Sequence, residues 1–435
     1  MSHPGDDISR DRRPLYGVLT ALGFSLTGTR IAAIALPWFV LVETDSATMT
    51  GLLALCEMGP YVLAKALGGP LVDSLGPRRV SVTADVVSGL TLGLIPVLWL
   101  AGVFDIGVVF VASAVFGALR GPGDSAKECF VPDLADRAQV PLERVTGLSG
   151  AIERLASTVG PAAGGAVVAL IGAVPALAVT ALAALVSATL VAAVAPAPAP
   201  APGPVHLEDA DPERYLARLH AGYRFIRGDG LIWSTVLMLA VTNFLDAALS
   251  SVLVPLWAKE SGGGPAAIGL VGSCLGVTAV LGSLCATFTG ERLPRRATFL
   301  VGFLVGGAPR FVVLALDAPV WVVASTWAVA GIGIGFINPI LSAVLFERTP
   351  RAMLGRANAL ADSLAWSLIP LGGIAAAGLL GVVGLAPALL ACGLGYLVST
   401  TIPALRPEWH EMSRPAVGPD PTAEAGVAAR RTFDR

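Results

Sequence analysis

The sequence predicts an all-α membrane protein in which twelve transmembrane helices form two pseudo-symmetric six-helix bundles. Of the 435 residues, 54% are hydrophobic and only 14% are charged, whereas about a quarter of the residues of a soluble domain are charged. The apolar residues occur in runs of about twenty, the length that an α-helix needs to cross roughly 30 Å of hydrocarbon. Landmarks of the first half also return in order in the second half, which predicts two copies of one unit.

The expected helices are the apolar runs that lie between charged residues or between Gly and Pro residues. In the first half they span 15–42, 50–72, 80–102, 106–122 with an extension, 142–172 and 174–195. In the second half they span 231–258, 265–289, 297–316, 320–346, 355–382 and 385–405. The expected domains are an N-terminal tail at 1–14, a bundle at 15–195, a connecting segment at 196–230, a bundle at 231–405 and a disordered tail at 406–435.

Basic residues indicate the side of the membrane on which each loop lies. Arginine is concentrated in one alternate set of loops, whereas the other set contains only Lys259. Because Lys and Arg are retained on the cytoplasmic side, we expect both termini in the cytoplasm. The excess of Arg over Lys is typical of a GC-rich bacterial coding sequence, so we expect a multi-pass protein of the bacterial cytoplasmic (inner) membrane.

The segment that connects the two bundles has two parts. Residues 196–204 alternate Pro with Ala or Gly, which favours a semi-rigid polyproline II spacer. Asp211 can then cap a helix whose apolar stripe includes Tyr223 and Ile226. We expect this amphipathic helix to lie on the cytoplasmic surface of the membrane.

The internal repeat is defined by polar as well as apolar landmarks. The offset between matched residues is 217 up to the fourth helix and 209 beyond it. The matches are Pro77-Arg78-Arg79 with Pro294-Arg295-Arg296, Pro122 with Pro339, Glu153 with Asp362, and Gly164-Gly165 with Gly372-Gly373. Parallel six-helix repeats are one of the recognised transporter plans, in which the substrate site lies between the halves near the midplane.

The loop after the second expected helix contains the most specific motif in the chain. It reads Gly69-Pro70-Leu71-Val72-Asp73-Ser74-Leu75-Gly76-Pro77-Arg78-Arg79. The glycines permit tight turns, the aspartate can accept hydrogen bonds at a helix end, and the arginines can bind headgroups. This run resembles the G-x-L-x-D-x-x-G-x-R-R signature of the major facilitator superfamily.

That resemblance implies a gating loop that latches the two halves together on the cytoplasmic side. The residues that it assigns to the latch are Gly69, Asp73, Gly76, Arg78 and Arg79. Asp73 would then face the start of the eleventh helix, near Gly355. The alternative is a purely topological role for the loop.

A second glycine-rich run, Gly160-Pro161-Ala162-Ala163-Gly164-Gly165, lies in the fifth expected helix. Its small residues allow close packing, and proline removes one backbone hydrogen bond. It resembles the G-P-x-x-G-G antiporter motif of exporters in the same superfamily, which implies export rather than uptake. The runs that resemble the macrolide-efflux and siderophore-exporter branch are Glu57-Met58-Gly59-Pro60-Tyr61, Val131-Pro132-Asp133-Leu134 and Leu354-Gly355-Arg356.

Ionisable residues inside the expected helices are candidates for function, because a charge at bilayer depth costs about 2.5 to 3.5 kcal/mol. They are Arg30, Glu57, Lys65, Asp85, Arg120, Glu153, Arg154, Asp246, Arg310 and Asp362.

The rise per residue places Arg30 and Glu57 at matching depths, so we expect them to form a pair, either as a proton switch or as a static bridge. The expected proton-coupling carboxylates are Glu57 and Asp246, followed by the repeat-matched Glu153 and Asp362. Arg310 is expected to be structural.

These residues and the resemblance together predict a secondary active transporter, in which protons drive efflux of a small hydrophobic or amphiphilic compound such as a drug, secondary metabolite or siderophore. The alternatives are an importer or symporter of a small solute and a non-transporting membrane sensor on the same fold. Scattered cysteines and few histidines predict no metal site and no cofactor. The sequence also lacks a paired nucleophile and base, so we expect no enzymatic activity. The expected partners are the substrate, protons and the lipid bilayer, with no nucleic acid, and we expect a monomer.

Overall fold

The computed structural model describes residues 12–68, 71–72, 75–195, 222–289, 293–349 and 354–413. Within these ranges the regular secondary structure is helical. Twelve helical segments of this part of the chain are long and apolar enough to cross a membrane. The predicted number of transmembrane helices is therefore confirmed.

The N-terminal half contains the first six of these segments. Its helices are α1 (Arg13–Thr44), α2 (Ala47–Leu67), α4 (Pro77–Leu100), α5 (Ile106–Glu128), α6 (Phe130–Ala138), α7 (Leu142–Ile171) and α8 (Ala173–Val194). The candidate span Ile106–Ala138 joins α5 to the short helix α6. The helical extension expected after Pro122 is thus present.

The C-terminal half contains the other six segments, several of which are interrupted. Its elements are α10 (Gly230–Ala248), the π-helical turn η2 (Leu249–Leu253), α11 (Val254–Glu260), α12 (Gly264–Thr289), α13 (Arg295–Gly306), α14 (Ala308–Ala315), α15 (Val320–Arg348), α16 (Leu354–Trp366), α17 (Ile369–Val383), α18 (Leu385–Ala404) and the 3₁₀ helix η4 (Pro407–Ser413).

The break between α13 and α14 falls at Gly307, where close packing leaves no room for a side chain. A Cβ atom added there would lie only 2.0 Å from Cε1 of Tyr396 on α18. The break between α16 and α17 precedes Pro370, which has no backbone N–H with which to continue the helical hydrogen bonds. These two interruptions therefore lie at a glycine and next to a proline.

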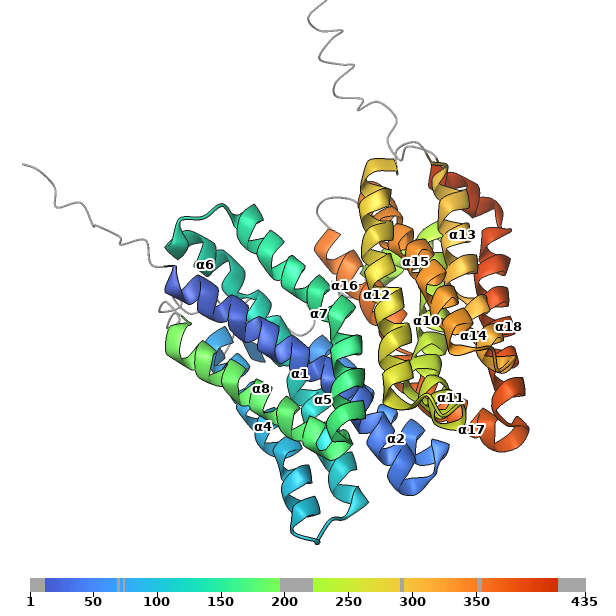
Figure 1. Cartoon of the computed structure of the whole chain (residues 1–435). Coiled ribbons are helices and arrows are strands. Elements are labelled where there is room, and N and C mark those ends of the chain that lie inside the picture. The colour runs from blue at the N-terminus through green and yellow to red at the C-terminus, as the bar shows by residue number, and fades with distance from the viewer. Residues whose placement is uncertain are drawn as a thin grey trace, which may run out of the picture.

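Each half has its own apolar core, as two related bundles require. The N-terminal core includes Leu36, Leu92 and Ile95, and the C-terminal core includes Phe299 and Phe311. Figure 1 shows the halves side by side, close together near α2, α11 and α17 and diverging toward the end that carries α6. A cleft between two packed bundles is the setting for the candidate site.

The start of α1 and the end of α18 lie at the end of the molecule where the halves diverge (Figure 1). We call this end the termini face and the opposite end the far face. At the far face the halves are joined by an ion pair between Lys259 Nζ and Asp45 Oδ1 at 2.5 Å. The Lys259 ammonium also donates to the Leu41 carbonyl at 3.2 Å.

Residues 407–413 form an ordered helix, so the prediction of a disordered tail from residue 406 is wrong for this stretch. We call Pro407–Ser413 the C-terminal strap. Trp409 is 0% exposed, and its Nε1 donates a hydrogen bond to Ser234 Oγ on α10 at 2.9 Å. Trp409 and Met412 are spaced three residues apart and together close the core at the termini face. Two apolar residues in a polar stretch gave too weak a periodic signal for prediction.

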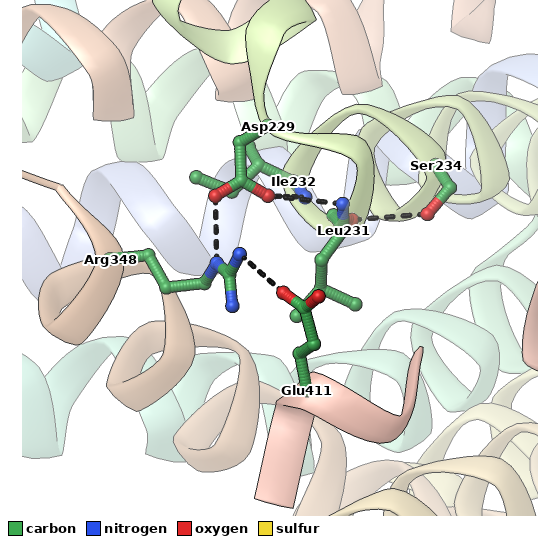
Figure 2. Close-up of polar contacts among 6 residues, drawn as sticks. All are labelled: Asp229, Leu231, Ile232, Ser234, Arg348 and Glu411. Carbon is green, nitrogen blue, oxygen red and sulfur yellow. Dashed lines mark hydrogen bonds and ion pairs between the residues drawn. The ribbon is translucent and has the colours of Figure 1, made fainter. Parts of the chain in front are cut away.

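Arg348, at the end of α15, joins the strap to α10, as Figure 2 shows. Its Nε donates to Asp229 Oδ2 at 2.7 Å, and its Nη2 donates to Glu411 Oε2 at 3.0 Å. The other oxygen of Asp229 caps α10 by accepting from the backbone N–H groups of Leu231 and Ile232. Burial would lower the pKa of Arg348, but these two carboxylates raise it. One arginine therefore ties together three elements.

The connecting segment is described only at its end. Residues 222–228 are helical, and the ring of Tyr223 packs edge-on against Trp233 of α10. The predicted spacer and the cap at Asp211 lie outside the described residues, as do 1–11 and 414–435.

Replacing Trp409 with Ala should destabilise the C-terminal half, because it leaves a cavity and removes the hydrogen bond to Ser234. We expect a loss of about 3 to 5 kcal/mol, measured as a lower melting temperature of the purified protein in detergent. The matched control is Trp321→Ala, since Trp321 is 72% exposed on α15 and should face lipid. Equal melting temperatures for the two variants would contradict a stabilising role for the strap.

Candidate functional site

The candidate site is the cleft between the two halves, which contains two hollows. The central cavity, about 400 Å³ in volume, is lined mainly by α1, α2 and α5 and is closed on the C-terminal side by Trp366 and Ile369. The side groove, about 480 Å³ in volume, lies between α7, α12 and α15. Glu153 lines both hollows, so the two hollows adjoin at this side chain.

Glu57 forms an ion pair with Arg120 at the wall of the central cavity. Its Oε1 lies 3.2 Å from Nη1 of Arg120, and the residue is only 6% exposed. The Arg120 guanidinium also lies over the ring of Tyr61, 4.2 Å from its centroid. A Cβ atom on Gly117 would lie 2.0 Å from the Glu57 carbonyl oxygen. The glycines of α5 thus bring its backbone against α2 and allow the pair to form.

Arg30 has a different partner from the one predicted. Its Nη2 donates to Ser157 Oγ on α7 at 2.8 Å, whereas its Nε has no hydrogen-bond partner among the described residues. The predicted Arg30–Glu57 pair is therefore wrong. The two depths were estimated from the helical rise, but the rotation of α1 about its axis turns Arg30 toward α7, and sequence periodicity did not fix that rotation.

A second buried ion pair lies deeper in the N-terminal half. Lys127 Nζ lies 2.8 Å from Asp85 Oδ1 and donates to Ser25 Oγ at 2.6 Å. The other oxygen of Asp85 accepts from Ser187 Oγ at 2.6 Å. Sequence analysis missed Lys127 because it lies in the extension beyond Pro122, whose charged residues were not counted among those inside the membrane. The available signal was a lysine that continues the helical register one turn beyond that proline.

The C-terminal half contains a carboxylate–arginine pair of its own. Arg310 Nη2 lies 2.6 Å from Asp246 Oδ1, and its guanidinium lies 6.0 Å from the ring centroid of Tyr396. Arg310 is buried, whereas the Asp246 side chain is about one-third exposed. Asn243, one turn earlier on α10, donates from Nδ2 to the Ala365 carbonyl of α16 at 3.0 Å. Arg310 was expected to be structural, but it partners a candidate coupling acid.

Glu153 and Asp362 occupy matched positions of the repeat but do not share a site. Glu153 faces the cleft from α7. Asp362 lies on α16 in a small pocket with Leu239, Val344 and Leu345. The structure therefore places Glu153 at the cleft and Glu57 behind Arg120 at the cavity wall, and it leaves Asp362 beside the cleft.

The motif Gly160-Pro161-Ala162-Ala163-Gly164-Gly165 packs against both halves. A Cβ atom on Gly160 would lie 2.6 Å from Cγ of Arg30, and one on Gly164 would lie 3.1 Å from the Arg30 carbonyl oxygen. A Cβ atom on Gly165 would lie 2.6 Å from the Pro265 carbonyl oxygen and 2.7 Å from Cα of Gly269. Gly160 and Gly164 therefore seat α1, while Gly165 seats α12 of the opposite half.

The gating-loop residues are only partly described. Gly69 and Asp73 lie outside the described residues, so the predicted contact of Asp73 near Gly355 stays a prediction. Gly76 has a φ of 81°, which favours glycine, and Arg78 donates to the Ala192 carbonyl at the end of α8. Arg79, one residue on, is exposed.

The second copy of the arginine pair makes a comparable contact. Arg296 donates to the Ala404 carbonyl at the end of α18 at 2.7 Å. Arg295 forms a bidentate ion pair with Glu347 of α15, at 2.7 and 2.9 Å. In both halves the pair thus binds the end of the last helix of its bundle.

Comparison with known families identifies the chain. The family model described as the Major Facilitator Superfamily matches residues 18–245 and 236–431. The chain belongs to the major facilitator superfamily. The superfamily membership predicted from the glycine-rich motifs is confirmed, and this major facilitator is a multi-pass membrane transporter.

Similar proteins include multidrug efflux pumps. The "Multidrug efflux pump Tap" of Mycobacterium tuberculosis is 30% identical over 403 residues, which cover 91% of this major facilitator and 95% of the pump. The pump of the same name from Mycolicibacterium fortuitum is 30% identical over 404 residues, covering 92% of this chain and 97% of the pump.

Solved structures of similar fold include two distant transporters. The nucleoside transporter NupG superposes with a TM-score of 0.68 at 14% identity, covering 93% of this chain and 99% of NupG. A bacterial homolog of the human lysosomal transporter Spinster, described as inward-facing and unoccupied, gives a TM-score of 0.70 at 13% identity, covering 97% of this chain and 100% of that one. At these identities the likeness confirms the fold of this major facilitator.

Replacing Gly165 with Ala should weaken the contact between the halves, because the new methyl group would overlap the α12 backbone. We expect a cost of about 1 to 3 kcal/mol in the state described here. Spin-label distances between α7 and α12 at the far face would report a shift toward a separated state. Gly150→Ala is the matched control, since nothing lies within 4 Å of a Cβ atom there. Unchanged distances in the Gly165 variant would contradict this role.

The Lys259–Asp45 ion pair should hold the far face closed at all ordinary pH values. The hydrogen bond from Lys259 holds the pKa of Asp45 below its usual range, so the ion pair is complete above that range and is lost only as pH falls through the lowered pKa. We expect Asp45→Asn to increase opening of the far face about two- to fivefold, the range for an exposed pair.

Cysteine labelling of the far face would measure that opening. Lys259→Ala should give the same effect, and the double variant should add nothing further. High salt should reduce the difference from wild type. A change in wild-type opening between pH 5 and pH 8 that the Asp45→Asn variant lacks would contradict the lowered pKa of Asp45.

Proposed function

We propose that this protein is a proton-coupled exporter of small amphiphilic compounds in a bacterial cytoplasmic membrane. The observation that carries the proposal is the 30% identity, over 91% of the chain, to a pump named for multidrug efflux. The cleft is compatible with such cargo, because Met58, Tyr61 and Trp366 line it beside charged side chains. Transport rather than catalysis is the proposed role, and the transporter acts as a monomer without nucleic acid.

The proposed orientation places the termini face in the cytoplasm. The arginine-rich loops that the sequence predicts to be cytoplasmic lie toward this face, and the two halves diverge toward the same end (Figure 1). The far face is closed by the α7–α12 contact and the Lys259–Asp45 pair. The state described here is thus ready to take up a compound from the cytoplasm or the inner leaflet.

Two carboxylate–arginine pairs are the proposed sites of proton coupling. Glu57–Arg120 borders the central cavity, and Asp246–Arg310 lies in the opposite half. Protonation of either carboxylate would cancel its attraction for the arginine and leave a buried cation to find another partner. Glu153 is a further candidate, because it faces both hollows and forms no ion pair among the described residues.

Replacing Glu57 with Gln should abolish coupling while preserving the packing of α2 on α5. In inverted membrane vesicles with an acidic lumen, wild type should accumulate an amphiphilic dye. The variant should accumulate less dye than wild type by a factor of about ten or more. Asp246→Asn should behave similarly if both pairs couple. Glu43→Gln, at an exposed position of α1, is the control.

The same vesicles separate the alternatives. Dye loss rather than accumulation under the acid-inside gradient would indicate a symporter. The lack of any gradient-dependent flux across a broad compound panel would indicate a non-transporting sensor. Full coupling in the Glu57→Gln variant would remove that carboxylate from the mechanism.

A further inference from the structure

The ammonium group of Lys65 lies between two aromatic rings at the boundary of the halves. Its Nζ is 4.9 Å from the ring centroid of Trp366 and 5.8 Å from that of Tyr61. The nearest oxygen, the Tyr61 hydroxyl, is 3.5 Å away, and Lys65 forms no ion pair with the described residues. Trp366 therefore holds this cation through its ring face and Tyr61 holds it at its hydroxyl edge. We call these two residues the aromatic seat.

The cations that line the central cavity fall into two classes. Arg120 and Lys127 are neutralised by direct ion pairs with Glu57 and Asp85. Arg30 and Lys65 have no such partner in the described part of the chain. The aromatic seat thus holds one of the two cavity cations that have no ion-pair partner in the described part of the chain.

The carboxylates of the same cavity outnumber these two free cations. Asp124, Glu128 and Glu153 line the cavity, and none forms an ion pair within the described ranges. Asp124 and Glu128 both lie within electrostatic range of Lys65, as does Asp362 from the other half. With the two tight pairs set aside, the cavity wall carries three carboxyl groups and two cationic side chains.

Carboxyl groups beside an aromatic ring face are the chemistry that recognises organic cations. We propose that the aromatic seat binds the cationic group of a transported compound, and that Lys65 occupies it as a tethered cation which the compound displaces. This rests on the proposed export function and assigns its cargo to the class of lipophilic cations. Lys65 is thereby a specificity residue, because any ligand must compete with its ammonium.

Displacement is chemically feasible for a lysine and has a structural consequence. The flexible four-carbon stem can carry the ammonium toward Asp124 or Glu128 when the seat is taken. Trp366 is the last residue of α16, directly before the break that separates it from α17. Release of Lys65 therefore removes a link between α2 and the end of α16.

A pair of probes with the same shape and opposite charge tests the proposal. Tetraphenylphosphonium and tetraphenylborate would be titrated by calorimetry into the full-length protein in detergent, with empty micelles as the background. Lys65→Met keeps the stem and removes the competing charge, so we expect it to tighten phosphonium binding about three- to tenfold. Borate binding should stay constant or weaken. Lys65→Arg should restore wild-type affinity for both probes.

Two further variants exclude a general effect of charge or shape. Arg154→Met removes an exposed cation from the side groove and should change phosphonium binding less than twofold, because solvent screens that charge. Trp366→Leu should weaken phosphonium binding and cancel most of the gain from Lys65→Met in the double variant.

Weaker phosphonium binding in Lys65→Met, an equal gain for both probes, or an equal gain in Arg154→Met would each overturn the proposal. Melting temperatures and gel filtration verify that each variant is folded. Because these titrations need no gradient, cation binding without flux would refute export and leave the aromatic seat intact. Coupled flux without the Lys65 effect would refute the role of the aromatic seat and leave the export function standing.

Discussion

Close backbone contact between the halves at the far face is the constraint on which the rest of this structure depends. Lipid offers no hydrophobic gain when two apolar helices associate, so tight packing of small residues must supply the contact. Gly165 against Gly269, and Gly51 against Gly373, bring the backbones within reach of each other. Because both contacts lie toward the far face, the halves can diverge at the other end and leave a polar cleft between them.

Inside that cleft a second constraint governs the charged side chains. A charge removed from water needs a partner on a neighbouring helix, and three of the buried cations have one: Arg120, Lys127 and Arg310. Arg30 and Lys65 form no ion pair with any residue that the structure describes, and both face the cavity. A side chain that must change partners during transport is expected to be one that has no fixed ion-pair partner. For this reason Lys65 and its aromatic seat bear on substrate choice.

The two halves are copies of one plan but hold their ends differently. In the first half Arg78 binds the carbonyl of Ala192. In the second half the equivalent contact to Ala404 is reinforced by the strap, which buries Trp409 and shares Arg348 with Asp229. The C-terminal bundle is thus braced at the termini face and can move as one body against the N-terminal bundle.

The sequence by itself determined the twelve spans, the repeat and the superfamily, because these follow from run length and from glycine, proline and arginine at fixed spacing. It also identified Glu57, Asp246 and Arg310 as charges inside membrane helices, since a charged residue is conspicuous in an apolar run. Only the tertiary structure decided their partners. Pairing depends on the rotation and tilt of each helix, which depth does not fix, and so Arg120 rather than Arg30 meets Glu57. The ordered strap likewise depends on tertiary structure, because Trp409 packs into the core of the C-terminal bundle. No local sequence pattern reveals that this core accepts a side chain from residues 407–413.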